Sequence, residues 1–198
     1  AIPFIELGFR HIVARDAAGR TVFYGPFQNE HQNHILDVTT WEAEPRGPAA
    51  RQAREIGQAV ADAFGLVGLI CVECFVATDG EVMVNEIAPR PHNSGHLTIE
   101  ACSISQFEQQ ARVTAGLGAV APIPRAPAAA MANLLGDLWA GGEPDWAAVL
   151  DHPAIAVHLY GKRDARPGRK MGHLTALADS PAAALELVRT ARRRLARG

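Results

Sequence analysis

Several features that mark common classes of protein are missing from this sequence of 198 residues. It has no run of 18 or more apolar residues, and its first residues carry no basic segment ahead of an apolar one. We therefore expect neither a membrane-spanning helix nor a signal peptide. Lys plus Arg number 19 and Asp plus Glu number 21, which gives a net charge of -2. This balance disfavours a protein that binds nucleic acid or an anionic membrane mainly through its charge.

Cysteine is also scarce, and the common glycine-rich motifs are absent. The three cysteines, Cys71, Cys74 and Cys102, are odd in number and lie in or beside apolar segments. That usage suits a reducing compartment, so we expect a soluble, cytoplasmic protein with buried thiols. None of the patterns G-x-x-x-x-G-K-[ST], G-x-G-x-x-G or G-x-S-x-G occurs. This excludes the commonest phosphate-binding loops and the esterase nucleophile elbow.

The hydrophobic pattern predicts a mixed α+β fold. We expect a polar loop at 26–37, because this stretch is rich in Asn and His. A helix should follow the capping residue Ser105 and point Phe107, Ala111 and Val113 or Thr114 toward the core. Glycine and proline between 116 and 130 suggest a boundary, so we divide the chain into 1–118, a connection at 119–130, and 131–198. The other expected strands lie near 4–14, 21–24, 66–76, 81–87, 131–135, 154–160 and 171–178, and the other helices near 49–64, 146–150 and 181–197.

Two glutamates face each other in one predicted hairpin. The turn at Asp79-Gly80 pairs Glu73 with Glu86 if the register is symmetric about it. Like charges directly opposite are destabilising, so the pair asks for a compensating cation such as Mg²⁺. The alternative is an ordinary surface ion pair with an arginine. Asn85 could add an oxygen to the same ion if a bulge or a strand end turns it to the same face, and the alternative is that it is a plain loop-forming residue.

The loop after this hairpin carries a group of side chains that suit an anionic ligand. Arg90, His92, Asn93, Ser94 and His96 fall within seven residues. A loop that leaves a rigid strand can present an arginine to an anion or to a developing negative charge. The plain alternative is a turn rich in Asn and Ser, which would account for Asn93 and Ser94 but not for Arg90 and His92.

A later loop concentrates positive charge. Five cations surround a single Asp164 within nine residues, around Pro167-Gly168. They are Lys162, Arg163, Arg166, Arg169 and Lys170. Such a patch on an otherwise balanced protein suits a phosphate group, and a solvated or RNA-facing loop is the alternative.

Two histidines stand close together in the polar segment at 26–37. His31 and His34 are spaced for a metal on a helix. No helix is expected there and no cysteine is near, so a zinc site is disfavoured.

The sequences around these residues closely resemble those of the N5-carboxyaminoimidazole ribonucleotide synthetases, which are ATP-grasp enzymes of purine synthesis and ATPase subunits of phosphoribosylaminoimidazole carboxylase. The resemblance covers most of the chain in the same order. It rests on GLVG at 65–68 leading to ECF at 73–75, VNEIAPRPHNSGH at 84–96, SISQFE at 103–108, YGK at 160–162 and RPGRKMGH at 166–173.

This resemblance implies a fold and a reaction. The fold would be the second lobe of an ATP-grasp domain, an antiparallel sheet with helices, followed by a small α/β C-terminal domain. The cofactors would be ATP and Mg²⁺. ATP would phosphorylate bicarbonate to carboxyphosphate, and the carboxyl group would pass to the amine of 5-aminoimidazole ribonucleotide. Phosphoryl transfer of this kind depends mainly on positioning and on neutralising negative charge.

The resemblance also implies roles for individual residues. Glu73 and Glu86 would hold Mg²⁺ against the ATP phosphates with Asn85 beside them, and His31 would lie at the nucleotide. Arg90 would act at the bicarbonate and the transferred phosphoryl group. The remaining positions would bind the ribonucleotide: His92 and Asn93 around its aminoimidazole, and Lys162, Arg169 and Lys170 at its 5′-phosphate.

The chain departs from the family pattern in two respects. The resemblance implies an N-terminal α/β domain and a first ATP-grasp lobe as partners, and without them we expect weak ATP binding and little turnover. The family places a glutamate where this chain has Gly8, and Glu6 lies two residues earlier.

Two other functions remain open. One is a different ATP-grasp ligase, such as the formate-dependent glycinamide ribonucleotide transformylase, which would not be expected to carry the Arg-x-His-Asn-Ser-Gly-His stretch. The other is a non-catalytic binding module that keeps the fold.

The family is often dimeric, so a homodimer is a further expectation.

Overall fold

The computed structural model describes residues 5–45 and 47–196, with side chains described from residue 8 onward. Its strands are β1 (Ile5–Arg15), β2 (Thr21–Gln32), β3 (Ile35–Glu42), β4 (Gly68–Ala77), β5 (Val82–Ala88), β6 (Ala128–Leu135), β7 (Ile155–Leu159) and β8 (Lys170–Ala178). Its helices are α1 (Pro48–Ala63), α2 (Thr98–Ala101), α3 (Gln106–Thr114), α4 (Ala147–Leu150) and α5 (Pro181–Leu195), with short 3₁₀ turns at Asn93–Gly95 and Gly136–Trp139.

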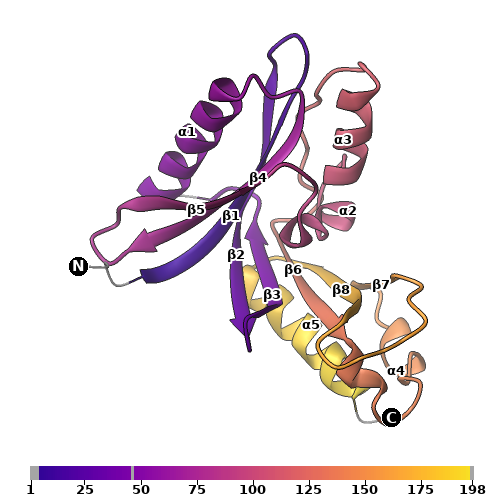
Figure 1. Ribbon diagram of the computed structural model, residues 1–198. Coiled ribbons are helices and arrows are strands. Elements are labelled where there is room, and N and C mark those ends of the chain that lie inside the picture. The colour runs from indigo at the N-terminus through magenta and orange to yellow at the C-terminus, as the bar shows by residue number, and fades with distance from the viewer. Residues whose placement is uncertain (1–4, 46, 197–198) are drawn as a thin grey trace.

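The described strands form one eight-stranded sheet in the order β5-β4-β1-β2-β3-β6-β8-β7 (Figure 1). All of its neighbouring strands run antiparallel. This arrangement confirms the predicted α+β class. The division at 119–130 stays a prediction, and β6 begins inside that segment and pairs with β3. No described helix is both long and apolar enough to cross a bilayer.

Alternation along β1 assigns the two faces of the N-terminal half of the sheet. Phe9 and Val13 point to one face, where they pack with α1, and Ile12 and Ala14 point to the other, toward α3. The cysteines follow the same rule, since Cys71 lies in one core and Cys74 in the other. Both are free and buried, as predicted from their spacing.

Helix α5 covers the C-terminal half of the sheet, where it packs on β3, β6 and β8 (Figure 1). Ser180 caps this helix, because its side-chain oxygen accepts a hydrogen bond from Ala183 N. The apolar positions recur at helical spacing and are buried in the second core. These residues are Ala184, Val188, Ala191 and Leu195, and the predicted face of the helix is confirmed.

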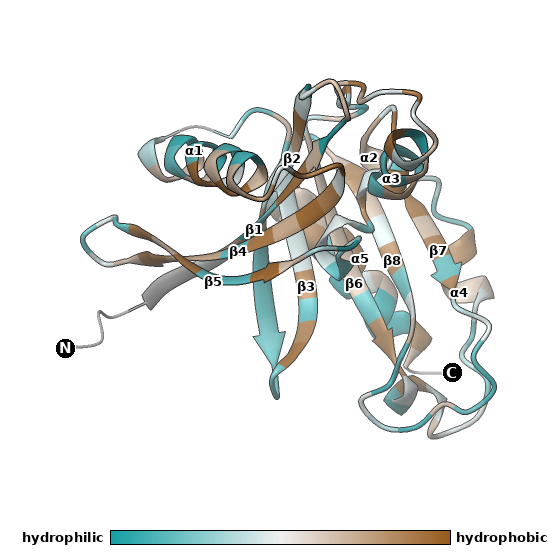
Figure 2. Cartoon of the chain, turned by 45° about the horizontal axis from the view of Figure 1, so that its top comes forward, coloured by the Kyte–Doolittle hydropathy of each residue, from teal (hydrophilic) through white to brown (hydrophobic). Residues whose placement is uncertain are grey.

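The predicted loop at 26–37 is wrong, because the chain there forms a β-hairpin. Strand β2 continues to Gln32, and Asn33 and His34 make the turn with φ of 50° and 63°. Two residues with positive φ suit the twist of a two-residue hairpin. The end of β2 is hydrophilic (Figure 2), and this polarity was the reason for predicting a loop. Polar side chains are tolerated in this strand where they are hydrogen-bonded, as is the buried Asn29.

The hairpin of β4 and β5 has the predicted register only beyond an irregularity. Glu73 lies opposite Glu86 as predicted, but next to the turn Val76 pairs with Val82, one residue out of the register that is symmetric about Asp79-Gly80. Nearer the turn Cys74 pairs with Val84, so the register shifts and Asn85 is the extra residue. A bulge at this position is the feature that a shared role of Asn85 and Glu86 requires.

Helix α3 begins as predicted and buries Val113 as expected, but the rest of its inward face differs from the prediction. The Ser105 side chain accepts a hydrogen bond from Glu108 N and caps the helix. The expectation that Phe107 enters the core is wrong, because Phe107 is 40% exposed whereas Gln106 and Gln109 are fully buried. Both amides face loop backbone, Gln106 at His92 and Gln109 at Val120. Backbone groups that need partners therefore decide which face of α3 is buried.

A histidine lies unsatisfied beneath α1. His11 is 2% exposed and packs against Phe23, and neither of its ring nitrogens has a hydrogen-bond partner within the described part of the chain. Burial, and after it the positive charge of Arg54, lowers the pKa of His11 to about 4. The folded protein therefore holds this ring neutral at neutral pH.

Replacing His11 by Leu should stabilise the fold, most strongly in acid. The change removes a buried polar group without a partner, which is worth about 1 kcal/mol at about pH 7.5. The unfolded histidine takes up a proton below pH 6.5, but the folded one does so only near pH 4. The free energy of unfolding of the wild type therefore falls as the pH is lowered from 6.5 to about 4. At about pH 5 the variant should gain a further ~2 kcal/mol. Urea unfolding at both pH values measures the two free energies. The same change in free energy of unfolding with pH in wild type and variant would refute the prediction. His152→Gln, at an exposed histidine, is the control.

Candidate functional site

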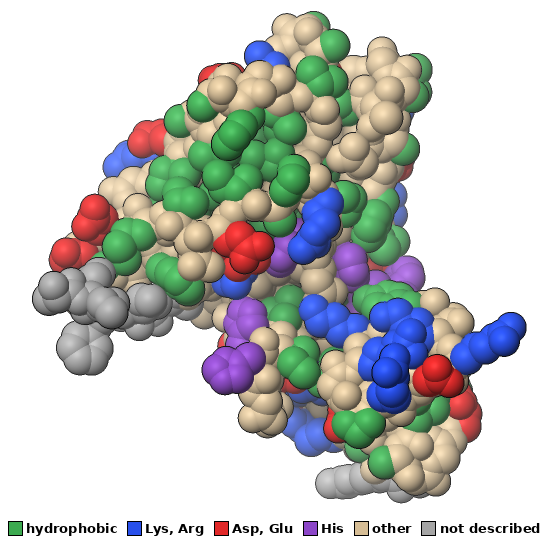
Figure 3. All heavy atoms as spheres, viewed as in Figure 1, with side chains coloured by type: hydrophobic (Ala, Val, Ile, Leu, Met, Phe, Trp, Pro, Cys, Tyr) green, Lys and Arg blue, Asp and Glu red, His purple; other side chains and the backbone are tan. Residues whose placement is uncertain are grey.

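A cleft of about 500 Å³ opens between the end of the β2–β3 hairpin, strand β4 and the loops at 90–93 and 162–170. Figure 3 shows Lys, Arg and His side chains gathered around the hollow between the two parts of the molecule. Seven of the site residues predicted from the sequence line this cleft. They are His31, Glu73, Arg90, His92, Asn93, Lys162 and Lys170.

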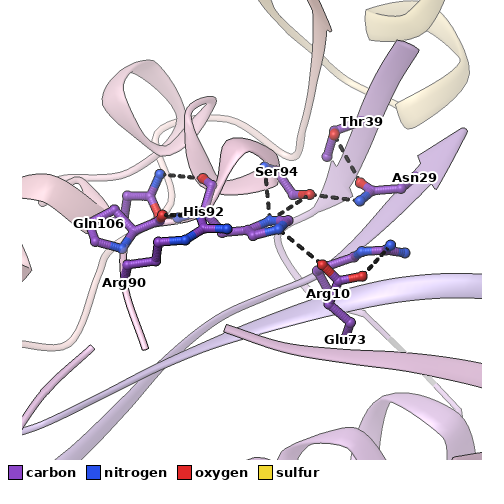
Figure 4. A network of polar contacts seen from close by, with 9 residues as sticks. Arg10, Asn29, Thr39, Glu73, Arg90, His92, Ser94 and Gln106 are labelled. Atoms are coloured by element: carbon purple, nitrogen blue, oxygen red, sulfur yellow. Dashed lines mark hydrogen bonds and ion pairs between the residues drawn. The ribbon is translucent and has the colours of Figure 1, made fainter. Parts of the chain in front are cut away.

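The centre of the cleft is the carboxylate of Glu73, which is compensated on both oxygens (Figure 4). Arg10 donates from Nη2 to Glu73 Oε2, and His92 Nε2 lies 3.1 Å from Glu73 Oε1. The hydrogen bond from His92, together with the charge of Arg10, lowers the pKa of Glu73 although burial opposes this shift. Glu73 is therefore an anion at neutral pH, and it belongs to β4, a strand that is paired on both of its edges.

A second set of contacts fixes the ring of His92. Ser94 N donates to His92 Nδ1 at 3.3 Å, so Nε2 is the ring nitrogen that carries a proton toward Glu73. Ser94 Oγ is 2.6 Å from the side-chain amide of Asn29, which in turn meets Thr39 Oγ1 at 2.9 Å. These contacts connect the loop to the middle of the sheet (Figure 4).

Gln106 holds the backbone of the same loop. Its Oε1 accepts from His92 N at 2.9 Å and its Nε2 donates to His92 O at 2.7 Å. The second hydrogen on Nε2 faces His96 Nδ1 at 3.1 Å. Gly95 makes room for this amide, since a Cβ there would lie 2.6 Å from Gln106 Oε1. The loop that carries Arg90 and His92 is thus fixed from beneath.

The opposite wall of the cleft is cationic. Lys162 Nζ donates to the carbonyl oxygen of Lys170 at 2.6 Å, and both lysines line this wall. Burial, and then the neighbouring charges of Arg90 and Lys162, lower the pKa of Lys170. Arg90 is exposed and donates to Pro91 O at 3.2 Å. Cations crowded in this way are stabilised by an anionic ligand.

Some predicted residues lie outside the cleft. Arg169 turns away and donates to Asp164 O at 2.9 Å within its own loop. Asn85 and Glu86 are exposed on β5, the strand next to that of Glu73.

The other predicted positions are His31, at the cleft, and Glu6 and Gly8, on β1. His31 lines the cleft mouth, and partial burial with the nearby Arg10 lowers its pKa. The side chain of Glu6 lies outside the described residues, whereas Gly8 is described and places no side chain beside Arg10.

A cluster of aromatic rings joins the two walls behind the cleft. His158 Nε2 lies 2.7 Å from Glu100 Oε1, and the rings of His158 and His173 stack at 4.5 Å. Tyr160 Oη is 2.9 Å from His173 Nδ1, and His96 packs on His173 at 5.2 Å. Burial lowers the pKa of His173 to about 3, so this ring is neutral at neutral pH.

Two family models match the chain. Residues 2–107 match the ATP-grasp domain, and residues 129–187 match the phosphoribosylaminoimidazole carboxylase C-terminal domain. The chain belongs to the ATP-grasp family. The resemblance inferred from its sequence motifs is thereby confirmed.

Individual relatives agree with this assignment. The N5-carboxyaminoimidazole ribonucleotide synthase of Brucella melitensis is 40% identical over 164 residues, which cover 83% of this chain and 44% of that protein. The structure of the synthetase from Thermotoga maritima aligns with a TM-score of 0.84 at 36% identity, over 97% of this chain and 52% of that one. The enzyme from Aspergillus clavatus, solved with ADP and 5-aminoimidazole ribonucleotide, aligns at 0.79 and 28% identity over 98% and 52% of the two chains. The chain thus spans about half the length of these relatives.

The carboxylates of this ATP-grasp chain fit a divalent cation. Glu73 and Glu86 lie opposite each other on neighbouring strands and offer hard oxygen donors, which Mg²⁺ prefers. Glu73 keeps acceptor capacity beyond its two hydrogen bonds, because an ionised carboxylate has about four lone-pair sites. Glu86 is exposed, so its side chain has room to join Glu73 in holding such a cation.

Sequence reasoning missed three residues of this ATP-grasp site. Arg10 was assigned no role, and Asn29 lay in the segment that was predicted as a loop. Gln106 stood in the motif SISQFE without a role of its own. A glutamine directly after a capping serine, where a helix buries its first turn, is a signal that could have found it.

Changing Gln106 to Glu should disrupt the loop that carries Arg90 and His92. The new carboxylate would face His92 O without a proton to donate, and the hydrogen bond to His96 would be lost. We expect a loss of about 2 kcal/mol in the free energy of unfolding. Nuclear magnetic resonance should also show that His92 no longer keeps its proton on Nε2.

The matched control for this change is Gln110→Glu. Gln110 lies one helical turn after Gln106 on α3, and its amide donates to Thr114 Oγ1 at 3.0 Å in an exposed position. This variant should keep the wild-type stability and the wild-type His92 ring. A stable Gln106→Glu variant with an unchanged His92 ring would contradict the clamp that we assign to Gln106.

Proposed function

We propose that this chain forms the substrate-binding and catalytic part of an N5-carboxyaminoimidazole ribonucleotide synthetase. ATP would transfer its γ-phosphoryl group to an oxygen of bicarbonate, which gives carboxyphosphate and ADP. The amine of 5-aminoimidazole ribonucleotide would then attack the carboxyl carbon. The bond from that carbon to the phosphate-bearing oxygen breaks, phosphate leaves, and the amine loses a proton.

The observation that carries this proposal is the composition of the two cleft walls. The Arg90–His92 loop and the Glu73 carboxylate form one wall, and Lys162 and Lys170 form the other. A ribonucleotide can place its 5′-phosphate on the lysines and its aminoimidazole ring near His92 and Asn93. Arg90 then lies where charge develops on the carboxyphosphate. Arg169 would contact the 5′-phosphate only if its side chain broke the hydrogen bond to Asp164 O.

The nucleotide and metal belong to the same proposal. Glu73 and Glu86 would hold Mg²⁺, with Asn85 beside them at the bulge and His31 at the nucleotide. The ion would supply positive charge against the phosphates of ATP. The relative from Aspergillus clavatus that was solved with ADP and 5-aminoimidazole ribonucleotide supports this choice of ligands.

We also propose that activity needs the part of the synthetase that this chain does not span. The chain covers 44% of the relative from Brucella melitensis, and a nucleotide clamp needs both of its lobes to exclude water. A cytoplasmic location and a homodimer complete the proposal. The three free, buried cysteines suit a reducing compartment.

Lys162→Met should weaken binding of 5-aminoimidazole ribonucleotide about tenfold, because one charged contact to the 5′-phosphate is lost. Isothermal titration calorimetry with the purified chain measures this. Arg163→Met is the matched control, since Arg163 is exposed in the same loop but does not line the cleft. Equal losses in both variants would indicate general electrostatic attraction instead of a phosphate site.

Glu86→Gln should lower ATP turnover about 100-fold or more when the remaining part of a family member is supplied as a separate chain. Turnover is measured with bicarbonate and 5-aminoimidazole ribonucleotide present. Glu81→Gln, near the turn of the same hairpin, is the control and should stay within about twofold of wild type. Turnover by the 21.1 kDa chain alone would refute the need for the other part.

A further inference from the structure

Three charged side chains form a row across adjacent strands. Arg10 on β1 lies directly opposite Glu73 on β4, and Glu73 lies directly opposite Glu86 on β5. The order of charges along the row is therefore positive, negative, negative. The row carries a net charge of about -1, whereas the two glutamates alone would carry about -2.

The first pair of this row is largely removed from water. The side chains of Arg10 and Glu73 are 9% and 12% exposed, and Arg10 donates to Glu73 Oε2. A guanidinium is always charged and is weakly hydrated, so it suits a buried ion pair. Glu86, by contrast, is exposed.

Gly8 makes room for this arrangement. It lies two residues before Arg10 on β1, and a Cβ at this position would approach Arg10 Nη1 to 3.2 Å. A larger side chain here would crowd the guanidinium. Gly8 thus leaves free the space beside the guanidinium of Arg10.

We propose that Arg10 is a built-in counter-cation for Glu73 that competes with divalent metal ions at the carboxylate pair. Arg10 holds one oxygen of Glu73 and reduces the negative charge that attracts an ion. A divalent ion then depends mainly on Glu86, at the exposed end of the row. This inference rests on the proposed function only in taking Glu73 and Glu86 as the metal-binding pair.

The test uses Mn²⁺ alone, with no nucleotide or ribonucleotide present. Electron paramagnetic resonance of free Mn²⁺ gives the affinity of the purified chain, and circular dichroism checks the fold. Arg10→Gln should bind Mn²⁺ about tenfold more tightly than wild type, because a competing charge is removed. Adding Glu73→Gln to Arg10→Gln should abolish this gain.

Matched variants separate the charge of Arg10 from other effects. Arg10→Lys keeps the positive charge and should stay within about twofold of wild type. So should Arg15→Gln, which removes an arginine of the same strand that pairs with Asp62 instead. Unchanged or weaker Mn²⁺ binding in a folded Arg10→Gln variant would overturn the proposal.

The wild-type background gives a second test if Arg10→Gln does not fold. Glu86→Gln and Glu73→Gln each change the net charge of the row from about -1 to about 0. Glu86→Gln should nevertheless weaken Mn²⁺ binding more than Glu73→Gln, because Glu86 is the carboxylate that Arg10 leaves uncompensated. An equal or larger loss in Glu73→Gln would overturn the proposal. Because only Mn²⁺ is present, these outcomes are independent of whether the chain binds 5-aminoimidazole ribonucleotide.

Discussion

The carboxylate of Glu73 organises the structure around the cleft. It is a largely buried anion beside a like charge, and such a group is stable only if the protein supplies donors or cations to it. Arg10 comes from the neighbouring strand and His92 from the following loop. The contacts of this one carboxylate therefore hold β1, β4 and the loop of His92 together. Ser94, Asn29 and Gln106 then hold the loop at the place where His92 reaches the carboxylate.

The second wall of the cleft is positioned by the sheet itself. Strands β3 and β6 pair directly, so the lysine loop after β7 is attached to the same sheet as β4. The stacked rings of His158 and His173, with Glu100 and Tyr160, add contacts across the back of the cleft. Both walls are therefore held at a defined separation before any ligand enters, which reduces the entropy lost on binding.

Local patterns predicted much of this structure. The Asp79-Gly80 turn led to the correct prediction that Glu73 and Glu86 lie opposite each other. The strands next to the turn are one residue out of the predicted register, however, and the bulge at Asn85 restores it at the glutamates. Helical spacing predicted the buried face of α5. The hairpin at β2 and β3 was missed because polar composition indicates exposure only on average, and Asn29 is buried with its partners. Those partners are distant in sequence, so no local pattern contains them. The same limit applies to the site: Arg10 and Gln106 act on residues 63 and 14 positions away, and only the fold brings these pairs together.

The fit between Gly95 and Gln106 has a consequence for how this loop can change over time. A Cβ at position 95 would lie 2.4 Å from Ile12 Cδ1 and 2.6 Å from Gln106 Oε1. A larger residue at position 95 is therefore compatible only with shorter side chains at positions 12 and 106. Substitutions at these three positions should accordingly be correlated among homologous sequences.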